Sequence, residues 1–92
     1  MKPSALVTDL YQLTMLAAYR RLGMTGEAVF ELYARRLPPE RGFLLVAGLE
    51  QALEYLETLS VTGAEREWLG SLGRFEPEFL DWLGRLRFTG EV

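Results

Sequence analysis

The chain has 92 residues, the size of one small domain, with a formal net charge of −3 and a sequence pI near 4.9. This acidic balance gives no basis for non-specific binding to nucleic acid. The lack of Cys excludes a disulfide framework, and the lack of His removes the usual acid–base group and the usual zinc ligand. The N-terminus resembles neither a signal peptide nor a membrane span, so we expect a cytoplasmic protein that binds neither nucleic acid nor membrane.

Apolar residues are abundant for a chain this short. Hydrophobic residues make up 49% of the sequence and aromatic residues 12%. A domain of this size buries only about 60–65 % of the surface that its unfolded chain exposes. The sequence therefore carries more apolar surface than it can bury alone, which indicates a partner.

The first predicted helix begins at Asp9 and runs to the arginines at 20–21, before Gly23. Asp9 and Gln12 have the spacing at which two side chains cap each other's backbone N–H groups, although Thr8 could be the cap instead. The arginines suit the negative end of the helix dipole, and the glycine is typical of a helix terminus.

This predicted helix carries two apolar stripes instead of one. Their members are Leu6, Leu10, Leu13 and Ala17 in the first stripe, and Tyr11, Met15, Ala18 and Leu22 in the second. A helix that only covers its own core needs one stripe, so the second implies another layer of the protein or another subunit. Tyr11 lies near the positive end of the helix, which favours anions, but the residues alone favour its interpretation as a core aromatic with its hydroxyl at the rim.

Two short strands are predicted after this helix. Successive side chains of residues 28–34 fall on two opposite faces with a period of two residues, and residues 43–46 form a continuous apolar run. A rigid turn that begins at Pro38 separates the two segments, so their simplest arrangement is an antiparallel pair. Residues 88–92 resemble the first step of a further strand, and we therefore expect the sequence to stop inside a larger domain.

Three more helices are predicted in the second half of the chain. One follows Gly48, one opens at the capping box Thr62–Glu65 and ends at Gly73, and one opens at Pro77. The residues expected to be buried in the last two helices are Trp68, Leu69 and Leu72, then Phe79, Leu83 and Leu86, with Leu80 and Trp82 beside them. The predicted fold class is α+β, with four helices and a two-stranded antiparallel β piece.

Few residues offer chemistry of their own. Without His or Cys no nucleophile–base pair can be assembled, and neither GxGxxG nor the P-loop lysine motif occurs. Asp9 could serve in catalysis or only as a helix cap. Arg35, Arg36 and Arg41 bracket the proline turn and could hold a phosphate or carboxylate, or could simply form an exposed basic turn that balances neighbouring glutamates.

Two stretches of the sequence, taken together, resemble a known family. They read TDLYQLTM at 8–15 and FELYARRLP at 30–38, followed by RGF at 41–43 and AGL at 47–49. In this order and spacing they resemble the N-terminal region of nicotinate phosphoribosyltransferase. The likeness continues through the second half of the chain to its end, so it covers essentially all of residues 1–92.

The resemblance implies an enzyme that joins nicotinate to the ribose of phosphoribosyl pyrophosphate and forms nicotinate mononucleotide for NAD salvage. It also implies coupled ATP hydrolysis with Mg²⁺ on the phosphates, although no cofactor, metal ligand or catalytic residue is expected in this segment. By this resemblance Tyr11 stacks on the pyridine ring in the active site of the neighbouring subunit of a head-to-tail homodimer. Asp9, Arg35, Arg36 and Arg41 complete the implied substrate-binding set.

The resemblance covers only an N-terminal domain. In the family a barrel domain with a phosphorylatable histidine follows this region, whereas residues 1–92 contain no His. The chain is therefore expected to be inactive alone and to need a homodimer with barrels or a barrel-bearing partner chain. The alternative, from another class of protein, is a small non-catalytic interaction module or remnant that pairs with itself or with a full-length enzyme.

Overall fold

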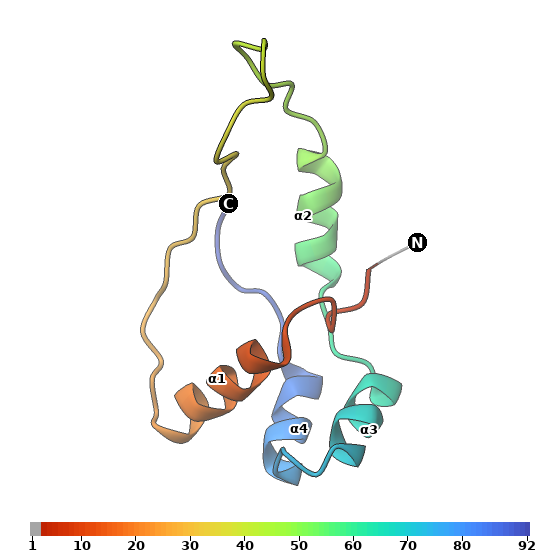
Figure 1. The fold of residues 1–92 in the computed structure, drawn as a ribbon. Coiled ribbons are helices and arrows are strands. Elements are labelled where there is room, and N and C mark those ends of the chain that lie inside the picture. Colours follow the sequence, from red (N-terminus) through yellow and green to blue (C-terminus); the bar gives the residue numbers. More distant parts are fainter. Residues whose placement is uncertain (1–2) are drawn as a thin grey trace.

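A computed structural model describes residues 3–92, which form four helices: α1 (Leu10–Arg21), α2 (Leu49–Thr58), α3 (Gly63–Ser71) and α4 (Pro77–Arg85). Helices α1, α3 and α4 gather at one end of the molecule, and α2 stands apart from them (Figure 1). Residues 24–48 form neither helix nor strand; they lead away from α1 to the far end and return to α2. The molecule is accordingly elongated, with extents of 50 × 30 × 25 Å.

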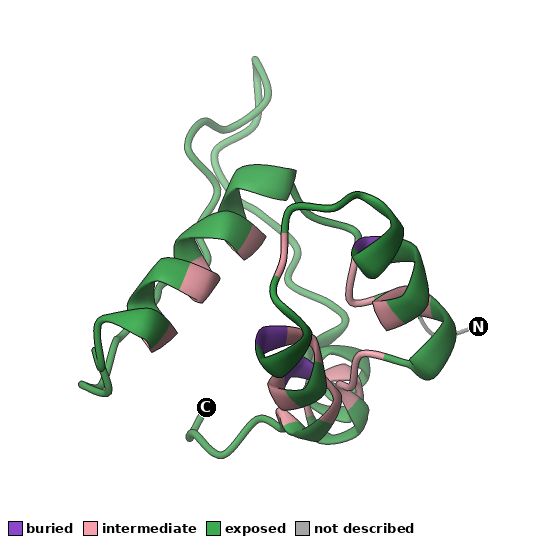
Figure 2. Ribbon diagram, turned by 90° about the horizontal axis from the view of Figure 1, so that it is seen from below, coloured by how far each residue is buried: buried purple, intermediate pink, exposed green. Residues whose placement is uncertain are grey.

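The hydrophobic core is small and lies where α3 meets α4. Its buried residues are Leu69 of α3 and Phe79 and Leu83 of α4 (Figure 2). Partly buried side chains surround them, namely Leu6, Leu13, Leu16, Ala17, Val61, Phe75, Leu80, Trp82 and Leu86. Among the described helices, extensive contact is limited to α3 with α4, so α1 is attached to this pair mainly through a few side chains.

The helix boundaries follow local signals in the sequence. The predicted capping box is present in α3, since Glu65 N–H donates to Thr62 Oγ1 at 3.2 Å and Thr62 N–H donates to Glu65 Oε1 at 2.9 Å. Pro77 occupies the first turn of α4, where its missing N–H costs nothing. Helix α1 ends before Gly23, whose φ of 68° is the left-handed conformation that glycine adopts without strain.

The start of α1 differs in one detail from the prediction. Asp9 is the cap residue, with extended φ and ψ of −78° and 145°, but its side chain makes no capping hydrogen bond. The Thr8 hydroxyl instead donates to Gln12 Oε1 at 2.8 Å. The predicted reciprocal cap between Asp9 and Gln12 is therefore wrong, because Gln12 is engaged by Thr8.

The predicted α+β fold class is also wrong, since residues 3–92 contain four helices and no strand. Both segments of the expected antiparallel pair, 28–34 and 43–46, lie open to solvent, and Phe30 and Leu32 are 90% and 102% exposed. An isolated pair of strands is at best marginally stable in water unless one face is covered. No other element covers these segments, and residues 88–92, for the same reason, do not form a strand.

Side-chain burial separates the faces of the helices. Leu69 of α3 is fully buried, as predicted, but Trp68 in the same helix is 55% exposed and Leu72, directly after the helix, is also exposed. The predicted burial of Trp68 and Leu72 is therefore wrong. In α4 the predicted inward residues all lie in or against the core. Helix α1 turns most of its first stripe, together with Leu16, toward the core, whereas Tyr11, Met15 and Leu22 of the second stripe are exposed.

Candidate functional site

The first turn of α1 presents an aromatic ring to solvent. Tyr11 is 57% exposed and lies outside the core, so the structure does not support its interpretation as a core aromatic. Its backbone carbonyl accepts a hydrogen bond from Thr14 Oγ1 at 2.8 Å, which adds a local contact to the helical turn. Asp9 lies two residues earlier and is exposed. The end of the helix therefore offers a ring and a carboxylate that nothing within residues 3–92 covers.

The predicted arginine cluster lies in the segment between α1 and α2. Arg35 and Arg36 form a bend, and the turn that follows is closed by Arg41 N–H donating to Pro38 O at 3.2 Å. All three arginines are exposed, and none has an ion-pair partner among the described residues. Figure 1 shows that this segment carries the turn to the end of the molecule opposite α1. The structure therefore does not bring these arginines together with Asp9 and Tyr11.

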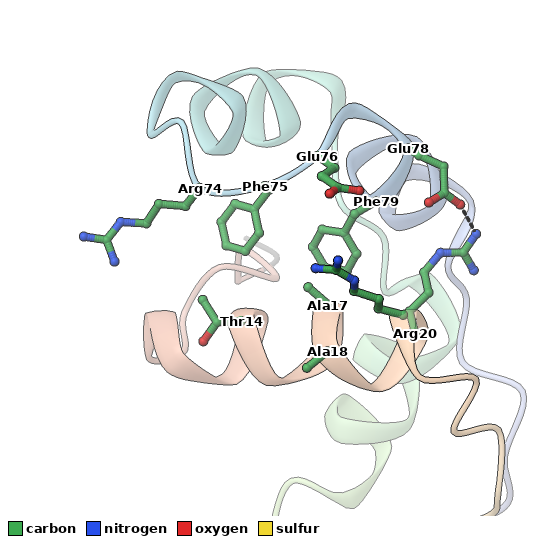
Figure 3. A pocket seen from close by; sticks show the side chains of 10 residues that line it. Thr14, Ala17, Ala18, Arg20, Arg74, Phe75, Glu76, Glu78 and Phe79 are labelled. Carbon is green, nitrogen blue, oxygen red and sulfur yellow. Dashed lines mark hydrogen bonds and ion pairs between the residues drawn. The ribbon is translucent and has the colours of Figure 1, made fainter.

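A cleft of about 630 Å³ lies between α1 and the beginning of α4 (Figure 3). Its lining combines small and aromatic apolar side chains with charged ones. The residues are Thr14, Ala17, Ala18, Arg20, Arg21, Arg74, Phe75, Glu76, Glu78 and Phe79. No local motif in the sequence indicates this cleft, because its two walls are far apart in the chain.

One ion pair joins the two walls of this cleft. Arg20 Nη2 donates to Glu78 Oε1 at 2.5 Å. The Arg20 guanidinium carbon also lies 4.8 Å from the centroid of the Trp82 ring, in a cation–π contact. The sequence signal for Arg20 suggested only a favourable interaction with the helix dipole, whereas the structure shows that it holds α1 against α4.

A second polar cluster ties the N-terminal segment to α3. The Ser4 hydroxyl donates to the Glu65 carboxylate, which also accepts the Thr62 backbone N–H as part of the capping box. These hydrogen bonds, chiefly the one from Ser4, hold the pKa of Glu65 below its ordinary value. The cluster is structural, since it fixes the path of the chain that leads into α1.

The described residues offer neither a metal centre nor a bilayer-crossing element. Within residues 3–92, no three acidic side chains come close enough together to bind a metal ion. None of the helices in that range has the length and apolar character needed to span a bilayer.

Comparison with known proteins identifies the family. The model of the nicotinate phosphoribosyltransferase N-terminal domain matches residues 6–92. A nicotinate phosphoribosyltransferase of Mycobacterium tuberculosis is 47% identical over 88 residues, which is 96% of this chain and 19% of that protein. The Bacillus subtilis nicotinate phosphoribosyltransferase is 42% identical over 77 residues, covering 83% of this chain and 16% of its own length. The Mus musculus nicotinate phosphoribosyltransferase is 36% identical over 88 residues, which is 92% of this chain and 16% of that protein.

The chain spans about a fifth or less of these curated relatives. No solved structure was found to match it. The predicted resemblance is confirmed by the family model and by the relatives, which agree over almost the whole chain. Because the match extends over residues 6–92, the chain belongs to the nicotinate phosphoribosyltransferase family, in the part that forms its N-terminal domain.

Proposed function

We propose that this chain is the N-terminal segment of a nicotinate phosphoribosyltransferase. Such an enzyme joins nicotinate to phosphoribosyl pyrophosphate, with coupled ATP hydrolysis, and forms nicotinate mononucleotide in NAD salvage. The observation that carries the proposal is the family match over residues 6–92, supported by relatives of that name at up to 47% identity.

The proposed contribution of this segment is to position the substrate. The pyridine nitrogen is a weak nucleophile, so holding the ring in line with the ribose carbon supplies much of the rate enhancement. Tyr11 is the proposed stacking group, and its exposure supports this role because the ring is available to a substrate held by a neighbouring subunit. Asp9, two residues earlier in the chain, is a further proposed substrate contact, and Arg35, Arg36 and Arg41 are the proposed contacts for phosphate or carboxylate.

The chemistry itself must come from residues outside this chain. The sequence has no His, and the described residues form no group of carboxylates that would fit Mg²⁺. The proposed active form is a homodimer in the cytoplasm, or a complex with a chain that carries the barrel, and the isolated 92 residues should form no nicotinate mononucleotide.

A chimeric enzyme tests this proposal. The corresponding segment of the 47% identical Mycobacterium tuberculosis relative is replaced by this chain, and nicotinate mononucleotide formation is measured. We expect the chimera to be active, Tyr11→Phe to retain activity and Tyr11→Ala to lose most of it. A folded chimera without turnover would contradict the proposal and favour the non-catalytic interaction module. Turnover by the isolated chain would contradict the assignment of catalysis to residues outside it.

A further inference from the structure

The residues through which α1 meets the rest of the chain lie along one face of the helix. Leu13, Leu16 and Ala17 pack against the core, and Arg20, one turn further on, contacts α4. Their spacing of three to four residues places these side chains on the same side of α1. Tyr11 precedes Arg20 by nine residues, or about two and a half helical turns, so its ring lies on the opposite side. The contacts that turn one face of α1 inward therefore turn Tyr11 outward.

These contacts differ in how strictly they fix the orientation of α1. Hydrophobic burial is non-directional, so the apolar side chains on this face allow the helix to tilt or turn by small amounts. Arg20 makes the directional contacts, because its Nη2 donates to Glu78 Oε1 at 2.5 Å and its guanidinium carbon lies 4.8 Å from the centroid of the Trp82 ring. Figure 3 shows the Arg20 side chain extending from α1 to Glu78.

Arg20 is also confined along its length, in contrast to the next residue. Its side chain is only 31% exposed, and its Nε is buried without a hydrogen-bond partner among the described residues. Arg21 is exposed and forms no ion pair within residues 3–92. Of these two neighbouring arginines in the last turn of α1, Arg20 is thus the one that ties the helix to α4.

We infer that Arg20 is a positioning residue for Tyr11, an inference that rests on the proposed stacking of Tyr11 on the substrate ring. The two residues lie about 13.5 Å apart along the helix axis at about 1.5 Å per residue, so a tilt of about 5° displaces one relative to the other by about 1 Å. A displacement of this size is enough to disturb the alignment of a substrate. A partly exposed ion pair adds little to stability, but this one sets the direction in which the Tyr11 ring is presented.

The orientation of α1 in the isolated chain tests this inference without any turnover. Backbone N–H residual dipolar couplings of the ¹⁵N-labelled chain report the direction of each helix. The couplings of α1, α3 and α4 should fit one common orientation in the unsubstituted chain, whereas those of α1 should depart from it in Arg20→Met. Arg21→Met is the matched control, because it removes a charge from the same turn without removing an ion pair. If α1 keeps its orientation in Arg20→Met as it does in the control, the inference is overturned.

The chimeric enzyme described above measures the effect on the substrate. In the chimera, Arg20→Met should raise the KM for nicotinate about tenfold, the effect of losing one aromatic stacking contact, and should leave the KM for phosphoribosyl pyrophosphate within about twofold. A general loss of folded enzyme would instead lower kcat and leave both KM values unchanged. In the Tyr11→Ala background, Arg20→Met should cause no further rise in the KM for nicotinate. A tenfold rise that persists in that background would overturn the inference, because Arg20 would then not act through Tyr11.

Glu78→Ala provides a second variant in case Arg20→Met is unfolded by circular dichroism. The Glu78 side chain is 71% exposed, so its removal breaks the ion pair without disturbing the core. This variant should also raise the KM for nicotinate and leave that for phosphoribosyl pyrophosphate unchanged. An inactive chimera, or one that keeps its activity in Tyr11→Ala, contradicts the proposed function. An active chimera that depends on Tyr11 but tolerates both Arg20→Met and Glu78→Ala overturns this inference alone.

Discussion

Replacement of Leu69 by Ala tests whether the small core between α3 and α4 holds the chain together. Leu69 is completely buried and contacts the two other buried residues, Phe79 and Leu83. The substitution removes apolar atoms at this point and leaves a cavity in place of their contacts. Because the core is so small, no second cluster of buried residues within 3–92 can compensate for the loss.

The expected magnitude is large relative to the stability of such a chain. Buried Leu→Ala substitutions destabilise by about 2.7–5.0 kcal/mol. A chain of this length typically has a free energy of unfolding of about 5–14 kcal/mol, and the small core favours the lower end of that range. Leu69→Ala should therefore remove about half of the stability or more, and should lower the melting temperature by at least about 10 °C.

Urea and thermal unfolding followed by circular dichroism measure this effect. Leu72→Ala is the matched control, because Leu72 directly follows α3 but is exposed. We expect the control to cost less than about 1 kcal/mol. If Leu69→Ala costs no more than Leu72→Ala, the contact between α3 and α4 does not determine stability and the reasoning is refuted.

Three further predictions concern polar and exposed groups. A double-mutant cycle with Arg20→Met and Glu78→Gln should give a coupling energy of about 0.2–1 kcal/mol in urea unfolding, because both side chains are partly exposed. The hydrogen bond from Ser4 lowers the pKa of Glu65 in the folded chain. The stabilisation by this carboxylate is therefore fully present above pH 4.5, its ordinary pKa, and is lost as the pH falls through the lower pKa of the folded state. Glu65→Gln should therefore reduce the loss of stability on acidification below pH 4.5. Tyr11→Ala should change the free energy of unfolding by less than about 0.5 kcal/mol, because the ring is 57% exposed.

Each of these predictions has a contradicting result. A coupling energy near zero would show that the ion pair does not hold α1 to α4. An unchanged acid unfolding curve in Glu65→Gln would show that the contact with Ser4 does not persist in solution. A large loss of stability in Tyr11→Ala would mean that its ring packs against this chain, which would weaken its assignment to substrate binding.

Local signals in the sequence were sufficient to predict the helices. All four occur in the predicted order, and the capping box at Thr62, the proline at 77 and the glycine at 23 mark their boundaries correctly. These signals depend on hydrogen bonds within a few residues, so the rest of the protein changes them little. The exception is Asp9, where a neighbouring hydroxyl competes for the intended partner.

The strands and the cleft could not be predicted in this way because both depend on contacts between distant segments. The alternation at 28–34 indicates which side chains share a face, but a strand also needs a neighbour to pair with and a surface to cover it. Similarly, periodicity grouped Trp68 with Leu69 without showing which of them meets α4. The ion pair of Arg20 with Glu78 joins residues that are 58 positions apart, so no short motif could indicate it.

The sparse attachment of α1 has a consequence for the order of folding. Helices α3 and α4 are close in sequence and make extensive contact, so they can form a local nucleus with little loss of chain entropy. For α1 to join them, the chain from residue 22 to residue 62 must close into a loop. Only a few side-chain contacts offset the chain entropy that is lost when this loop closes. We expect substitutions in α3 and α4 to slow refolding, and substitutions at Leu13 or Leu16 mainly to accelerate unfolding.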